Sequence, residues 1–133
     1  MQKTSLSFLD LCLSIPDDKI STSIDYKPTD THGYLQYGSS QPPHCKNAIP
    51  YNQFLRLRRI CSDETDFEEK SAEMGIFFAR RGYPQRIITS SQRKAKDTSC
   101  DTALRTPRRE TSGHSGRLRL VLTYHPKNQE VKN

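Results

Sequence analysis

The stretch DETDFEEKSAEMGIFFARRGYP, residues 63–84, decides the fold because it has the features of a helix with a defined start and stop. Its first turns are acidic and its last turn is basic, the order that complements the helix dipole at both ends. Its apolar stripe consists of Phe67, Met74, Phe77 and Phe78. Gly82 and Pro84 form a stop. The stretch predicts a helix that begins at Asp63 or the serine before it and ends near Arg81.

A second helix is predicted upstream of this stretch. Pro50 suits the first position of a helix, since its missing N–H would have no partner there, and the pattern continues to about Cys61. On a helical wheel the apolar residues share one face, while Arg56 and Arg59 lie on the other. Residues 27–49 contain prolines and glycines throughout, which predicts a connector without regular structure.

The N-terminal region has the two-residue period of β-strands. Apolar residues alternate with polar ones over residues 6–15, as in a strand with one buried face. Pro16, Asp17 and Asp18 then supply turn chemistry, and the alternation resumes over residues 20–26. Residues 6–26 therefore predict a β-hairpin.

The region downstream of Gly82 is less regular. A third, weaker helix is predicted from Pro84 to about Lys94, since it has few large apolar residues. Residues 96–116 carry almost no large apolar groups, which predicts a disordered basic linker. Residues 117–126 form a short strand-like segment, with the hairpin as its one obvious partner. The alternating residues of this segment are Leu118, Leu120, Leu122 and Tyr124.

These segments together predict an α+β fold. An N-terminal β-hairpin is followed by a small bundle of two to three helices over residues 50–95, and then by a largely disordered C-terminal tail. The chain has 133 residues and 32% apolar content, so it fits at most one small domain without a large core.

Charge and cysteine usage restrict the class of protein. The net charge of +6 favours an anionic partner, nucleic acid first. The four cysteines are scattered and no secretory signal precedes them, which predicts a reduced intracellular protein, with the nucleus as one location. No apolar run approaches the roughly 18 residues of a membrane span, so no membrane partner is expected.

Neither metal chemistry nor nucleophilic catalysis finds support in the sequence. Asp17 and Asp18 are the only adjacent aspartates, and they lie in a predicted turn without a third carboxylate. Structural zinc sites usually pair ligands two to four residues apart, a spacing that the candidate ligands lack. These candidates are His32, His44, Cys45 and Cys61. We predict no catalytic residue and no metal ligand.

The basic residues are more informative. Lys46, Arg56 and Arg59 could contact successive phosphates from one helix, although a solvated charged face would give the same pattern. Arg58 lies near the apolar side, where its charged group needs a buried acceptor or extends out to solvent. The helix over residues 63–81, its turn and the following segment also outline a helix-turn-helix, although any helical hairpin with a glycine turn looks similar. Its groove-facing residues would be Gln85, Arg86, Ser90 and Arg93.

Several short strings resemble the reverse transcriptases of Penelope-like retroelements. They are FLD at 8–10, YKPTDTH at 26–32, YL at 34–35, PPHCK at 42–46, IPY at 49–51, RLRRICS at 56–62 and LTYHP at 122–126. The resemblance implies an RNA-directed DNA polymerase as the parent enzyme, with residues 6–26 as a palm-edge hairpin and the helices as a thumb-like region. The chain contains no Tyr-x-Asp-Asp motif, so it would be a non-catalytic fragment, inactive alone.

The resemblance also implies partners and contacts. Such a fragment would hold a template–primer duplex by its backbone and would abut the missing palm and fingers. It would need no cofactor itself, because Mg²⁺ would bind in the missing catalytic core. The backbone contacts would come from Lys27, Lys46, Arg56 and Arg59, with Tyr34 or Tyr51 as packing or stacking groups. Four alternatives stay open: a free-standing helix-turn-helix DNA-binding protein using Arg86 and Arg93, an interaction module, an active enzyme, and a degenerate element copy without function.

Overall fold

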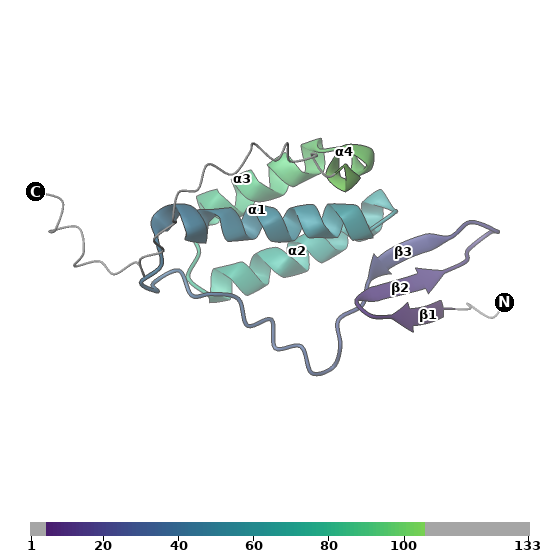
Figure 1. The fold of residues 1–133 in the computed structure, drawn as a ribbon, viewed down its shortest axis with the longest axis horizontal. Helices are drawn as coiled ribbons and strands as arrows, with labels where there is room; N and C mark the ends of the chain where they lie inside the picture. Colours follow the sequence, from purple (N-terminus) through teal and green to yellow (C-terminus); the bar gives the residue numbers. More distant parts are fainter. Residues whose placement is uncertain (1–4, 106–133) are drawn as a thin grey trace, which may run out of the picture.

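The computed structural model describes residues 5–105, in which a small β-sheet precedes a group of helices (Figure 1). The elements are β1 (Ser5–Phe8), β2 (Leu11–Ser14), β3 (Ser21–Ile24), α1 (Pro43–Ile60), α2 (Glu64–Arg80), α3 (Gln85–Asp97) and α4 (Cys100–Leu104). The predicted α+β class, with strands first and helices after them, is confirmed. The predictions for residues 106–116 of the linker, for the segment 117–126 and for the rest of the tail lie outside the described residues.

The sheet is antiparallel with the strand order β1-β2-β3. The predicted hairpin corresponds to β2 and β3, but the prediction of one strand over residues 6–15 is wrong. The chain reverses at Leu9 and Asp10, so that Phe8 pairs with Leu11. Leu9 has a φ of 56°, which glycine or asparagine usually adopts. The alternation of apolar residues continues through this turn, so the sequence pattern gave no indication of it.

The register gives the sheet one apolar face and one hydroxyl face. Side chains on one side of neighbouring strands line up across the sheet, as in the row Phe8, Leu11 and Ile24. The opposite face carries Ser7, Cys12, Ser14, Ser21 and Ser23. Burial on the apolar face decreases outward from the helices: Ile24 of β3 is 5% exposed, whereas Phe8 of β1 is 60% exposed. The helices therefore cover only the β3 side of this face.

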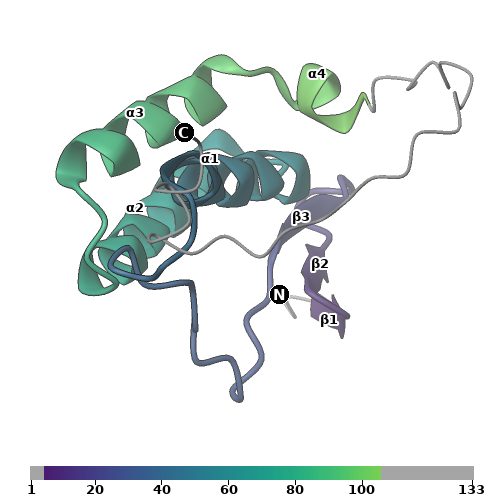
Figure 2. The same ribbon diagram turned by 60° about the vertical axis from the view of Figure 1, so that its left-hand side comes forward.

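The sheet is attached at the end of α1 through two hydrogen-bonded residues. The N–H of Thr22 donates to Oγ of Ser62 over 2.9 Å, and the N–H of Ser62 donates to the carbonyl of Thr22 over 3.0 Å. The hydroxyl of Thr22 also donates to the carbonyl of Ile60 over 2.6 Å. Both ribbon views show β3 as the strand nearest to the helices (Figures 1 and 2).

Helix α1 begins earlier than predicted. Its first residue is Pro43, and Pro50, the predicted start, lies inside the helix. Both prolines follow the rule that proline suits a helix start, so the rule alone could not choose between them. Pro50 is buried inside this helix, where proline cannot donate the usual backbone hydrogen bond. The connector between β3 and α1 accordingly ends at Pro42, short of the predicted residue 49.

The segments after α1 agree with the predicted elements except after residue 95. Helix α2 occupies the predicted range, and α3 confirms the weaker third helix while extending it to Asp97. The disordered linker predicted from residue 96 is wrong over its described part, because α4 forms there. Oγ of Ser99 caps α4 by accepting the N–H of Thr102, and Ala103 is buried. A small buried alanine gives little hydrophobic pattern, so the sequence did not indicate α4.

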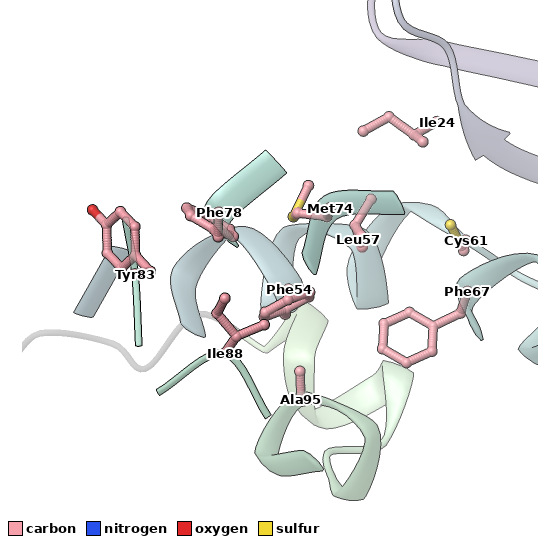
Figure 3. Close-up of a cluster of buried hydrophobic side chains, with 10 residues drawn as sticks. All are labelled: Ile24, Phe54, Leu57, Cys61, Phe67, Met74, Phe78, Tyr83, Ile88 and Ala95. Carbon is pink, nitrogen blue, oxygen red and sulfur yellow. The ribbon is translucent and has the colours of Figure 1, made fainter. Parts of the chain in front are cut away.

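The core lies where α1, α2 and α3 meet (Figure 3). It consists of Ile24, Phe54, Leu57, Cys61, Phe67, Met74, Phe78, Tyr83, Ile88 and Ala95. The rings of Phe54 and Phe78 are tilted against each other at 6.0 Å, and Tyr83 packs edge-on against Phe78 at 5.1 Å. The predicted stripe of α2 is thus confirmed for Phe67, Met74 and Phe78.

Candidate nucleic-acid interface

Helices α2 and α3 form a helix-turn-helix whose turn is fixed in place. Gly82 adopts a φ of +81°, which glycine tolerates best, and its N–H donates to the carbonyl of Ala79 over 3.0 Å. The N–H of Tyr37 in the connector donates to the carbonyl of Arg81 over 3.0 Å. Tyr83, the residue after the glycine, is 4% exposed. The turn is therefore held by hydrogen bonds from α2 and from the connector, and it fixes the direction of α3.

Helix α3 has one buried face and one basic, exposed face. Ile88, Ser91 and Ala95 are buried against the other helices. Arg86 and Arg93 lie seven residues apart on the opposite side, about 10 Å along the axis. Both are exposed, and neither makes an ion pair within residues 5–105. Their guanidinium groups are thus available to an external anion.

Polar side chains accompany these two arginines. Thr89 lies between them on the helix surface and is exposed. Nε2 of Gln85 donates to Oγ1 of Thr89 over 3.3 Å, which places an amide and a hydroxyl at the start of α3. The sequence interpretation named Gln85 but missed Thr89. The spacing of three and four residues from Arg86 and Arg93 would have identified it.

The charge of α3 contrasts with that of α2. Helix α3 carries Arg86, Arg93, Lys94 and Lys96 against Asp97. The first turns of α2 are acidic, and Glu68 forms an ion pair with Lys96. The hydrogen bond from Lys96 to Glu68 raises the pKa of this lysine. Lys96 is therefore partly neutralised, whereas Arg86 and Arg93 on the outer face, and Lys94 beside them, make no ion pair within residues 5–105.

The predicted basic residues of α1 instead contact the protein itself. Nζ of Lys46 donates to the carbonyls of Tyr37 and Ser39 over 2.7 and 3.0 Å. Arg56 forms an ion pair with Asp10 over 2.5 Å. Nε of Arg59 donates to the carbonyl of Ala103 over 2.6 Å. These cations hold the connector, the β1–β2 turn and α4, and they do not join Arg86 and Arg93 on one face.

Lys27 lies in an acidic neighbourhood. It is exposed and lines a hollow beside Arg56, together with Asp10, Asp25 and Asp30. Three carboxylates in one hollow oppose the approach of a phosphate. The structure therefore separates Lys27 from the basic face of α3.

Arg58 and the two tyrosines also have roles within the fold. Of the two alternatives for Arg58, the structure shows an acceptor: Nε donates to the carbonyl of Thr98 over 3.0 Å. Its second partner is Glu64, and the ring of Phe67 lies 5.1 Å from its guanidinium carbon. Tyr34 stacks on Phe78 at 4.7 Å, so its ring is occupied. Tyr51 is half-buried and lines a hollow between α1 and α3.

The titratable groups inside the fold are poor candidates for catalysis. Burial, together with the nearby Asp66, raises the pKa of the Cys61 thiol to about 12, so it stays protonated at neutral pH. Burial likewise raises the pKa values of Tyr26, Tyr34 and Tyr83. Within residues 5–105 no three His, Cys, Asp or Glu side chains form a group that could hold a metal ion. Among these residues no helix is both long and apolar enough to cross a membrane.

Comparison with protein families gives a match that covers the helix-turn-helix. Residues 33–93 match the family described as the animal helix-turn-helix domain. The matched segment runs from the connector through α1 and α2 to Arg93 on α3, and so contains the helix-turn-helix and its basic face. No curated protein and no solved structure gives a significant match to the chain.

This match corrects the predicted family. The prediction of a Penelope-like reverse transcriptase is wrong, because the family that matches is the animal helix-turn-helix domain and no comparison returns a reverse transcriptase. The predicted polymerase fragment, with its missing palm, its Mg²⁺ and its template–primer duplex, depended on that resemblance and has no support. Residues 33–93 are instead similar to the animal helix-turn-helix domain, which implies a nucleic-acid partner for the chain.

Proposed function

We propose that this protein binds duplex DNA, with α3 as the helix that enters the major groove. The observation that carries the proposal is the outer face of α3, where Arg86 and Arg93 are exposed and make no ion pair within residues 5–105. In helix-turn-helix proteins the second helix of the motif occupies the groove and its N-terminal residues contact base edges. The match over residues 33–93 supports the same use of α3.

The residues of α3 suit this task chemically. Gln85 and Arg86 lie in the first turn, and their side chains have the donors and acceptors that recognise adenine and guanine in the major groove. Arg93, two turns further along, is placed for a phosphate contact beside the groove. The helix has 13 residues, about 20 Å, which is long enough to cross the groove.

The experiment compares two pairs of arginines that differ in where their charge is used. Arg86→Ala and Arg93→Ala remove cations from the outer face of α3, and each should weaken binding to a duplex of mixed sequence about tenfold. Arg56→Ala and Arg59→Ala remove the same charge from α1, where the arginines bond to Asp10 and Ala103. They should change binding much less. Fluorescence anisotropy at several salt concentrations measures affinity and its salt slope together.

The outcomes separate the alternatives. A loss of affinity confined to Arg86→Ala and Arg93→Ala, with a shallower salt slope for Arg93→Ala, supports α3 as the DNA-binding helix. A greater loss for the α1 pair would overturn this assignment. Weak binding with almost no salt dependence would indicate an interaction module without nucleic-acid function. Circular dichroism of each variant separates lost contacts from lost folding.

A further inference from the structure

The apolar face of the sheet extends beyond the helices that cover it. Leu6 and Phe8 of β1 point to the same face as Ile24, yet they are 63% and 60% exposed. Both ribbon views show the sheet projecting from the end of the helical bundle, with β1 farthest from α1 (Figures 1 and 2). An exposed apolar strand of this kind marks a surface that another element covers.

The same strand has an open edge. Within residues 5–105, β1 pairs only with β2, so one row of its backbone groups has no strand beside it. An open edge of a sheet accepts a further strand through main-chain hydrogen bonds, and alternate side chains of that strand then cover one face. The occupant of this site must therefore be an extended segment with apolar residues at every second position.

We propose that residues 117–126 of this same chain form that strand beside β1. The segment RLRLVLTYHP has Leu118, Leu120 and Leu122 at every second position, so these side chains would share the face of Leu6 and Phe8. Arg119 and Thr123 would then lie on the hydroxyl face. Pro126 ends the segment, because proline cannot donate to a ladder.

Charge also favours this occupant over a second copy of the sheet. Residues 5–26 carry four aspartates against Lys19, whereas residues 117–126 carry Arg117 and Arg119 and no acidic residue. The aspartates lie in the turns and directly after β3, so two copies would bring like charges near one another, whereas the C-terminal segment brings the opposite charge.

The position where α4 ends makes the connection possible. Ala103 bonds to Arg59 near the end of α1, and Ser62, three residues after Arg59, bonds to β3. The 12 residues from 106 to 117 can span up to about 40 Å. The edge of β1 lies two strands beyond β3, about 10 Å. The chain therefore has ample length to reach it.

Hydrogen exchange of the full chain tests this pairing. Leu120→Asp places a charge on the face that would cover Leu6, and Thr123→Asp places the same charge on the opposite face as a matched control. We expect the amides of β1 to exchange about tenfold faster in Leu120→Asp than in the unchanged chain or in Thr123→Asp. The reciprocal variant Leu6→Asp should accelerate exchange in residues 118–124. Unchanged exchange in α2 shows that each variant is folded.

Three results would overturn the proposal. The first is equal exchange of β1 in the unchanged chain and in Leu120→Asp. The second is an equal effect of Leu120→Asp and Thr123→Asp, which would make charge rather than side-chain direction the cause. The third is protection of β1 that rises with protein concentration alongside dimerisation in light scattering, since a second copy would then occupy the edge. None of these results depends on whether the protein binds DNA.

Discussion

The guanidinium of Arg59 donates from Nε to the backbone carbonyl of Ala103 over 2.6 Å and thereby ties the end of α1 to α4. A charged donor to a partly buried carbonyl contributes about 1.5–3 kcal/mol. Arg59→Ala should therefore lower the free energy of unfolding by about 1–2 kcal/mol, because water replaces part of the bond, and should speed hydrogen exchange in α4. Urea unfolding measures the first effect. Arg93→Ala, on the outer face of α3, is the control and should change stability by less than about 0.5 kcal/mol.

Two glycines in different backbone conformations give a second prediction. Gly82→Ala forces an alanine to a φ of +81° and should destabilise the fold by about 1 kcal/mol, although its Cβ would meet nothing closer than 3.9 Å. Gly38→Ala is the matched change, because Gly38 has no positive φ and nothing within 4 Å of an added Cβ. It should be neutral or slightly stabilising. Thermal unfolding measures the stability of both variants. An equal loss of stability in the two would contradict backbone conformation as the cause.

The core of the helical bundle gives a third prediction. Phe78 is fully buried and packs against Phe54, Tyr34 and Tyr83, so Phe78→Ala should cost about 3–5 kcal/mol. Ile76 on the same helix is 54% exposed, and Ile76→Ala should cost less than about 1 kcal/mol. Denaturant unfolding followed by circular dichroism gives both values. Similar losses would show that α2 does not present its predicted face to the core.

The raised pKa of the Cys61 thiol predicts how the free energy of unfolding depends on pH. Its folded-state pKa is raised from 9.0 to about 12, so the native state holds this proton more tightly than the unfolded chain does. The stabilising contribution is complete below pH 9 and is lost as the pH rises toward 12. Between pH 9 and pH 10 it should fall by about 1 kcal/mol.

Two variants test this assignment. Cys61→Ala should lose less stability than the unchanged protein over the same pH interval, whatever its stability at pH 8. Cys45→Ala changes an exposed thiol and should keep the original slope. Urea midpoints at pH 8, 9 and 10 provide the measurement. Identical slopes in all three proteins would assign the alkaline loss to other groups.

The sequence predicted those elements whose determinants are local. Helix α2 has its acidic start, its apolar stripe and its Gly82 stop within one stretch, so its bounds followed from that stretch alone. The start of α1 did not, because Pro43 and Pro50 obey the same local rule and only the burial of Pro50 in the folded core distinguishes them. The turn at Leu9 and Asp10 is likewise held by Arg56, which lies 46 residues away.

The candidate site was predicted only in part, again because some of its determinants are local and others are not. The positions of Arg86 and Arg93 on α3 follow from helical periodicity, which is a local property. The partners of Lys46, Arg56 and Arg59 do not, since each acceptor lies on another element of the fold. A count of basic residues therefore could not distinguish the arginines of α1, which hold the fold together, from those of α3, which face outward.

The hydrogen bonds between Thr22 and Ser62 also bear on the order of folding. They join residues 40 positions apart, so the chain must close a long loop before the sheet gains anything from the helices. The helices bury most of the core among themselves, and within residues 5–105 the sheet contributes only Ile24 to it. We therefore expect the bundle to assemble as the early folding unit, with the sheet docking last. Under mild denaturing conditions the sheet should then be the first part to separate from the bundle.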